Sequence, residues 1–219
     1  MRIVLATTNA GKVAEMQALL DDSGLDVEVV ARPDGLVVVE DALDFAGNAA
    51  KKARAVAVAT GEWALADDSG LEVDALDGAP GVRSARFAGD DATDADNVRL
   101  LLRRLDDVGA VSPESRRARF RCAVVLASSE AEELVAGGAV EGRIVADPRG
   151  SNGFGYDPIF VPDDGDGRTF AEMSRAEKGS MSHRGRALRA LLDELSPDSF
   201  PRSVVQNVKD PSRSAQQNG

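Results

Sequence analysis

The chain has few of the side chains that build redox, zinc or nucleophilic centres. Its 219 residues include one cysteine, Cys122, and one histidine, His183. A single cysteine excludes an intramolecular disulfide and a cysteine-rich zinc site. A single histidine excludes every site that needs two, and leaves His183 as the one histidine that a Ser-His-Asp triad could use.

Aromatic residues and long apolar runs are also scarce. Aromatics make up 4% of the chain and hydrophobic residues 43%, so aliphatic side chains and alanine must form the core. No apolar run approaches the ~18 residues that span a bilayer. The opening residues 1–6 are typical of a strand and not of a signal peptide. We therefore expect a soluble, cytoplasmic protein that binds no membrane.

Basic residues are outnumbered, with 26 lysines and arginines against 37 acidic residues and a net charge of −11. This balance disfavours binding to a nucleic acid polymer, which rests on a basic face. A small nucleotide remains compatible, because its phosphates need only a local basic pocket or a metal ion. Five of the basic residues are lysines, and Lys12, Lys52 and Lys178 are candidate point charges for a phosphate or a base carbonyl.

Strand-like and helical segments alternate, which predicts an α/β fold. Apolar runs or alternation predict strands over 3–6, 26–30, 63–66, 71–76, 119–127 and 134–145. Helical spacing predicts helices over 13–20, 45–60, 93–106 and 188–195. The last two strands should form a long hairpin, so we expect a mixed central sheet flanked by helices. One domain should cover 1–199, followed by a disordered polar tail over 200–219.

Two polar stretches follow predicted strands. Thr7, Thr8, Asn9, Ala10, Gly11 and Lys12 open the first helix, where backbone N–H groups and the ammonium suit a phosphate. Ordinary helix capping, with Asn9 or Thr8 as the N-cap and Lys12 as a surface charge, also explains the same residues. Asp67-Asp68-Ser69-Gly70 is expected as a turn after a strand, with its two carboxylates on opposite faces and only one of them in a cleft. That carboxylate could hold Mg²⁺ or orient a water, or the turn could simply be solvated.

Two further stretches lie late in the chain. Residues 150–158 combine three glycines with Phe154 and Tyr156, which could stack on a planar base, while Asp157 could accept a base N–H. These aromatics could equally be core anchors. Residues 177–185 place the only histidine and two cations before a helix, although a lone histidine more often caps or packs.

Taken in order, these stretches resemble the noncanonical purine nucleoside triphosphate pyrophosphatases, the Ham1-like or inosine triphosphatase family. The resemblance spans about residues 2–195 and rests on the segments 6–12, 66–71, 78–81, 84–94, 153–160 and 178–185. It implies an ITPase-like fold shared with Maf proteins. It also implies Mg²⁺-dependent hydrolysis of ITP, dITP or XTP to the monophosphate and pyrophosphate, by a homodimer.

The resemblance also implies roles for individual residues. Asp68 would be the general base and, with Glu40, a Mg²⁺ ligand, while Ser69 and Lys52 would contact the substrate. The triphosphate would lie on Thr7 to Lys12. The base would be held by Phe154, Gly155, Tyr156, Asp157, Lys178, His183 and Arg184. Hydrogen-bond donors on Lys178, His183 or Arg184 would bind the 6-keto oxygen of hypoxanthine or xanthine. Adenine carries an amino group there, which is itself a donor, so these donors would be left without a partner. Guanine shares the 6-keto group, so its exclusion needs a further contact.

Two positions depart from the family pattern. Thr8 stands where relatives often carry glycine, and Gly47 where many carry glutamate, which would leave Glu40 and Asp68 to hold the metal. Two alternatives stay open at this point. One is a Maf-like nucleotide pyrophosphatase with another base preference, and the other is a nucleotide-binding sensor without catalysis.

Overall fold

A mixed β-sheet forms the centre of the protein. The structure is a computed structural model that describes residues 2–24 and 27–195. Its described strands form one sheet in the order β2-β1-β3-β4-β5-β6, with β1 at Arg2–Leu5, β2 at Glu28–Ala31, β3 at Trp63–Val73, β4 at Arg117–Ala127, β5 at Glu133–Ile144 and β6 at Phe160–Pro162. β1 runs parallel to β2 and β3, while β3 to β6 pair antiparallel. The predicted mixed α/β sheet and its long β4–β5 hairpin are confirmed.

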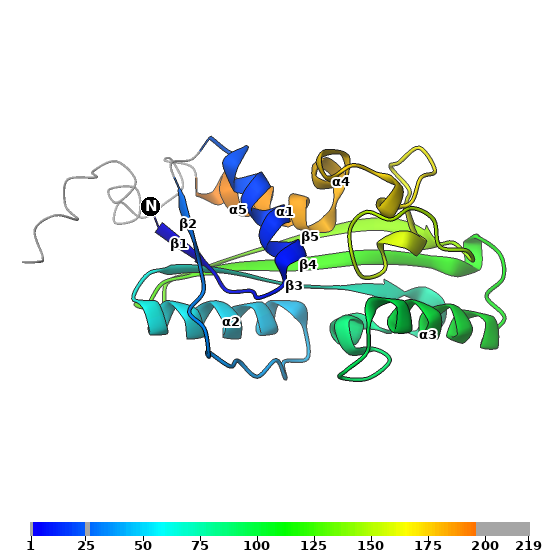
Figure 1. The fold of residues 1–219 in the computed structure, drawn as a ribbon, viewed down its shortest axis with the longest axis horizontal. Coiled ribbons are helices and arrows are strands. Elements are labelled where there is room, and N and C mark those ends of the chain that lie inside the picture. The colour runs from blue at the N-terminus through cyan, green and yellow to red at the C-terminus, as the bar shows by residue number, and fades with distance from the viewer. Residues whose placement is uncertain (1, 25–26, 196–219) are drawn as a thin grey trace, which may run out of the picture.

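Helices cover both faces of this sheet (Figure 1). One face carries α1 (Ala10–Asp21), the short α4 (Arg175–Met181) and α5 (His183–Glu194). The other carries α2 (Phe45–Thr60) and α3 (Asp94–Asp107). Aliphatic clusters fill the layers under α1 and α5 and under α2, and the aromatic side chains Phe120, Phe160 and Phe170 gather at the opposite half of the sheet. The core is therefore mostly aliphatic, as the composition predicts.

Local sequence explains the helix ends. α2 is rich in alanine, begins after Asp44, whose side chain accepts the N–H of Gly47 at 2.7 Å, and ends at Gly61 with φ +70°. α3 begins with a capping box between Thr93 and Asp96. The predicted helices over 45–60 and 93–106 are confirmed to within one residue.

The expected turn at Asp67–Gly70 is wrong. These residues lie in the middle of β3, which continues from Trp63 to Val73 and pairs with β4 along its length, for example Asp68 with Ala123. The ladder hydrogen bonds to a long central neighbour outweigh the turn preference of an Asp-Ser-Gly sequence. The strand predicted over 71–76 is likewise wrong in its second half, where residues 74–76 form a 3-10 turn.

A close approach of α5 to the sheet sets the position of the late polar motif. A Cβ atom added to Gly138 on β5 would lie 2.2 Å from the carbonyl oxygen of His183. The absence of a side chain there brings the start of α5, with His183 and Arg184, directly onto the strands.

Residues 200–219, the predicted tail, lie outside the described residues, as do 1, 25–26 and 196–199. Across the part of the chain that is described, no helix is long and apolar enough to cross a membrane.

Candidate active site

A cleft of about 280 Å³ opens where β1, β3, α1 and the loop before β6 meet. All of the predicted site residues except Ala10 and Gly11 line it. Further lining residues to which the sequence assigned no individual role include Arg32, Ser84, Arg86, Asp94, Asn97 and Phe120, of which Ser84, Arg86 and Asp94 lie in the segment 84–94 that carries the resemblance. The fold thus brings together four polar stretches that are far apart in the chain.

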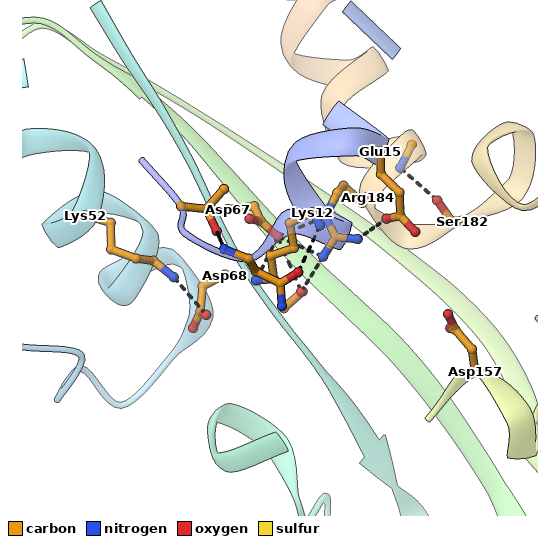
Figure 2. Close-up of polar contacts among 12 residues, drawn as sticks. Lys12, Glu15, Lys52, Asp67, Asp68, Asp157, Ser182 and Arg184 are labelled. Atoms are coloured by element: carbon orange, nitrogen blue, oxygen red, sulfur yellow. Dashed lines mark hydrogen bonds and ion pairs between the residues drawn. The ribbon is translucent and has the colours of Figure 1, made fainter. Parts of the chain in front are cut away.

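Two adjacent carboxylates divide the site between the faces of the sheet. Successive side chains on a strand point to opposite faces. Asp68 therefore meets Asn48 and Lys52 of α2, while Asp67 meets Lys12 of α1 and Arg184 of α5 (Figure 2). The expected opposition of the two aspartates is confirmed, although they stand in mid-strand.

Asp68 belongs to a small cluster on the α2 side. The Nζ atom of Lys52 lies 3.2 Å from the Asp68 carboxylate and 2.9 Å from that of Glu40, and the Asn48 amide donates to Asp68 at 3.2 Å. Burial raises the pKa of the Asp68 carboxyl above its usual value, although Lys52 and Lys12 oppose the shift. Burial by itself lowers the pKa of Lys52, but Asp68, Asp67 and Glu40 outweigh it, and the net shift is upward. Asp68 is thus a carboxylate with enhanced basicity beside a firmly charged ammonium.

Asp67 forms a second group of ion pairs, on the α1 and α5 side of the sheet. Its Oδ2 atom forms ion pairs with Lys12 Nζ at 3.1 Å and Arg184 Nη2 at 2.9 Å, and accepts a hydrogen bond from Arg184 Nε at 3.0 Å. Burial alone raises the pKa of this carboxyl, but Lys12 and Arg184 hold it well below its usual value. Arg184 also donates to Ser69 at 2.9 Å and contacts Glu15. Arg184 therefore cross-links α1, β3 and α5.

The loop before α1 both caps the helix and lines the cleft, the two possibilities that its sequence left open. Asn9 is the helix N-cap and accepts the N–H of Lys12 at 3.1 Å, and Thr7 accepts the N–H of Asn9 at 3.2 Å. The loop nevertheless lines the cleft, with Lys12 directed to Asp67. Capping and exposure to a ligand coexist here, because the N-terminus of α1 points at the cleft.

The loop that carries Phe154 is held on several sides. Asp157, which is almost fully buried, accepts the N–H of Phe154 at 2.9 Å and lies 2.6 Å from Lys178 Nζ. The Gly155 N–H donates to Asp94 at 2.7 Å, and the Tyr156 hydroxyl donates to the Ser84 carbonyl at 2.9 Å. Tyr156 is buried in the aromatic core, so it is a core anchor, one of the two roles that the sequence allowed for it, and it also lines the cleft.

Cations cover the ring of Phe154. Lys178 Nζ lies 4.9 Å from the ring centroid and Arg184 Cζ 5.7 Å from it. A Cβ atom added to Gly11 would lie 2.7 Å from this ring, so the ring rests directly on the first turn of α1. The phosphate-side and base-side motifs therefore touch each other in this structure.

His183 is buried at the base of the cleft. Its ring stacks on Phe120 with centroids 4.7 Å apart and an interplanar angle of 8°. Burial, reinforced by Arg184 and Lys178, lowers its pKa well below the usual value, so the imidazole is neutral near pH 7. Its Nδ1 atom is buried without a protein hydrogen-bond partner. A neutral histidine with an unmatched ring nitrogen is suited to hydrogen bonding with a ligand.

Sequence reasoning missed Glu15 and Asn48. Glu15 is bonded to Lys178 at 2.8 Å and to Arg184, and these cations hold its pKa below the usual value despite its burial. Helical spacing could have found both residues, because Glu15 lies three positions after Lys12 and Asn48 four before Lys52.

A divalent metal fits the α2 side of the cleft. No group of three or more acidic, histidine or cysteine side chains gathers within the described ranges. Glu40 and Asp68, however, both contact the Lys52 ammonium, at 2.9 and 3.2 Å, so an oxygen of each carboxylate lies within reach of one cation. Two carboxylates supplemented by waters and substrate phosphates are a usual environment for Mg²⁺.

Comparison with known proteins agrees with this arrangement. The model of the Ham1 family matches residues 3–194. The chain belongs to the Ham1 family. It is 50% identical over 199 residues to the dITP/XTP pyrophosphatase of Shigella flexneri, covering 89% of this chain and 98% of the relative. It is 51% identical over 196 residues to the dITP/XTP pyrophosphatase of Frankia alni, covering 87% and 95%.

Solved structures of Ham1 proteins share the fold. A HAM1 protein from Coxiella burnetii superposes with a TM-score of 0.78 at 43% identity, covering 90% of this chain and 98% of the other. A dITP/XTP pyrophosphatase from Mycobacterium abscessus gives a TM-score of 0.69 at 47% identity, covering 89% and 100%. The ITPase-like architecture expected from the motifs is confirmed for this Ham1-family chain.

Proposed function

We propose that this chain hydrolyses ITP, dITP and XTP to the nucleoside monophosphate and pyrophosphate, and so clears noncanonical purines from the nucleotide pool. Membership of the Ham1 family and the dITP/XTP pyrophosphatases about 50% identical to it support this activity. The observation that best supports this chemistry is the position of Asp68. Its carboxyl group has a raised pKa and lies in the same cleft as the candidate phosphate-binding and base-binding residues.

Asp68 acts as the general base. Its carboxylate takes a proton from a water molecule, whose oxygen forms a bond to the α-phosphorus. The bond between that phosphorus and the oxygen bridging to the β-phosphate breaks, and pyrophosphate leaves. A raised pKa favours proton transfer to Asp68, because a more basic carboxylate is a better acceptor. Asn48 and Lys52, both hydrogen-bonded to Asp68, orient the carboxylate toward the water.

Negative charge on the phosphates is met by fixed positive groups. Lys12 and the N-terminus of α1 provide such charge on one side of Asp68, and Lys52 provides it on the other. Glu40 and Asp68 would hold Mg²⁺, which when bound supplies Lewis-acid neutralisation of the phosphate oxygens.

The base is recognised on the α4–α5 side. Phe154, Lys178 and His183 line this part of the cleft, with the Lys178 ammonium over the Phe154 ring, and offer the base an aromatic side chain and polar groups. In its Nδ1–H tautomer, His183 donates to the 6-keto oxygen of hypoxanthine or xanthine, a partner that its buried Nδ1 lacks within the protein. Adenine presents an amino donor at this position and leaves the histidine unpaired, which costs about 1–3 kcal/mol in a buried site.

Product identity tests this proposal. Purified protein is incubated with dITP, XTP, dATP and dGTP in MgCl₂ or EDTA, and pyrophosphate is separated from orthophosphate. We expect magnesium-dependent pyrophosphate release from dITP and XTP. The variant Asp68→Asn should lose about 100-fold or more in kcat, whereas Asp166→Asn, an exposed carboxylate outside the cleft, should keep full activity. Orthophosphate as the product, equal rates on all four substrates, or full activity in Asp68→Asn would refute it.

We also propose that the enzyme works as a cytoplasmic homodimer, as the family resemblance implies. Light scattering on the purified chain measures its mass directly, and a monomer at the concentration of the assay would refute the dimer.

A further inference from the structure

Cations that line the cleft fall into two groups by their partners. Four of them contact carboxylates directly: Lys12 with Asp67, Lys52 with Glu40 and Asp68, Lys178 with Glu15 and Asp157, and Arg184 with Glu15 and Asp67. The remaining two are Arg32 and Arg86. Among the described residues, neither guanidinium forms a salt bridge with an acidic side chain.

Both arginines are held by backbone carbonyls instead. Arg32 donates through Nη2 to the carbonyl of Leu36, and its Nε atom is buried without a hydrogen-bond partner. Arg86 donates through Nη2 to the carbonyl of Glu40 at 3.2 Å. A carbonyl orients a guanidinium but leaves its charge uncompensated, so each arginine has donors and charge to offer a ligand.

The balance of charge in the cleft makes Arg32 and Arg86 the cations best placed to bind an anionic ligand. The four paired cations contact five acidic residues, so their positive charges are offset inside the protein. Arg32 and Arg86 therefore supply much of the uncompensated positive charge in a cleft that otherwise carries acidic side chains. A polyphosphate is the ligand class that matches two guanidinium groups without a carboxylate partner.

Their position selects one end of the substrate. Lys178, His183 and Phe154 lie on the base side of Asp68. Arg86 instead donates to the backbone of Glu40, whose side chain meets Lys52 beside Asp68, and Arg32 donates to the backbone of Leu36 in the segment that leads to Glu40. We propose that Arg32 and Arg86 bind the β- and γ-phosphates, the part of the substrate that leaves as pyrophosphate. This assignment to a leaving group rests on the function proposed above, whereas the anion site itself does not.

Direct binding of two product probes tests the proposal. Titration calorimetry in MgCl₂ measures the affinity of inorganic pyrophosphate and, separately, of dIMP for the intact chain. Arg32→Gln and Arg86→Gln should each weaken pyrophosphate binding about 10-fold, as expected for loss of a charge-assisted hydrogen bond, and leave dIMP binding unchanged. Arg86→Lys, which keeps the charge, should restore part of the loss. Arg83→Gln is the matched control for Arg86, because both arginines lie on the 3-10 segment Gly81–Arg86, whereas Arg83 is exposed and does not line the cleft.

The outcomes separate this proposal from the proposed function. Unchanged pyrophosphate affinity in Arg32→Gln and Arg86→Gln would overturn the proposal, as would equal losses for pyrophosphate and dIMP, which indicate a structural role. Hydrolysis of dITP by the unmodified chain is measured in parallel. Selective loss of pyrophosphate binding without any such hydrolysis would leave the anion site standing and refute the proposed function.

Discussion

Replacing Asp67 by asparagine tests the energetics of the site most directly. The substitution keeps the shape of the side chain and removes the charge that faces Lys12 and Arg184. Asp67 is 1% exposed and Arg184 is 1% exposed, so water cannot take the place of the lost partner. Asp67→Asn therefore leaves buried positive charge with one fewer counter-ion.

The expected cost follows from the contacts. Breaking a buried ion pair by removing one partner costs about 3–5 kcal/mol. Glu15 still contacts Arg184, and the asparagine oxygen still accepts one hydrogen bond, so we expect the lower end, about 3 kcal/mol. For a chain of this size, that loss lowers Tm by about 6–12 °C. Because the pKa of Asp67 is depressed in the folded state, its stabilisation is present above the ordinary carboxyl pKa and is lost only in strong acid. The difference should thus be constant from pH 6 to 8.

Urea and thermal unfolding of the two proteins at pH 7.5 measure this difference. The control is Asp166→Asn, which also breaks an Arg–Asp pair, with 2.9 Å between Arg168 and Asp166, but at an exposed site. Exposed pairs contribute little to stability, so the control should unfold almost as the parent does. An Asp67→Asn protein whose stability also matches the parent would refute the view that this pair holds α1, β3 and α5 together.

Two further predictions concern His183 and Asp94. Because burial lowers the pKa of His183, the unfolded chain binds a proton that the folded chain does not, and stability should fall as pH drops below about 6.5, by up to about 1.4 kcal/mol per pH unit. His183→Asn should flatten the dependence of the free energy of unfolding between pH 6.5 and 5.5, and an unchanged slope would contradict the assignment. Asp94→Ala removes the acceptor of the Gly155 N–H and frees the Phe154 loop, so KM for dITP should rise about 5-fold with a smaller change in kcat. Asp94→Asn, which keeps an acceptor oxygen, should recover part of this affinity, and a variant that changed kcat alone would argue against a positioning role.

Much of the fold follows from local sequence. Alanine-rich residues between Asp44 and Gly61 specify α2, and apolar spacing with a Thr93 cap specifies α3. Alternation over residues 119–127 identifies β4, although only the first half of the strand has an exposed face. Every residue from Cys122 to Ala127 is buried, because helices cover both faces of the sheet there. Each of these patterns depends on residues that are close together in the chain, and it can therefore be recognised without the folded structure.

The order of polar motifs also identified the family, and it named most of the residues that line the cleft. Their partners were less accessible to sequence reasoning. The pairing of Arg184 with Asp67 joins residues 117 positions apart, and that of Lys178 with Glu15 joins residues 163 apart. Such contacts depend on how α1 and α5 pack on the sheet, and no local pattern encodes them.

The sequence by itself determined the helices, the alternation of the sheet and the set of chemical groups available to the site. Tertiary structure alone decided that Asp67 and Asp68 stand in mid-strand. A turn preference is a local energy of a few residues, whereas β4 offers β3 a ladder of hydrogen bonds along its whole length. The same ladder places the two carboxylates on opposite faces, where Asp68 contacts Lys52 of α2 and Asp67 contacts Lys12 of α1 and Arg184 of α5.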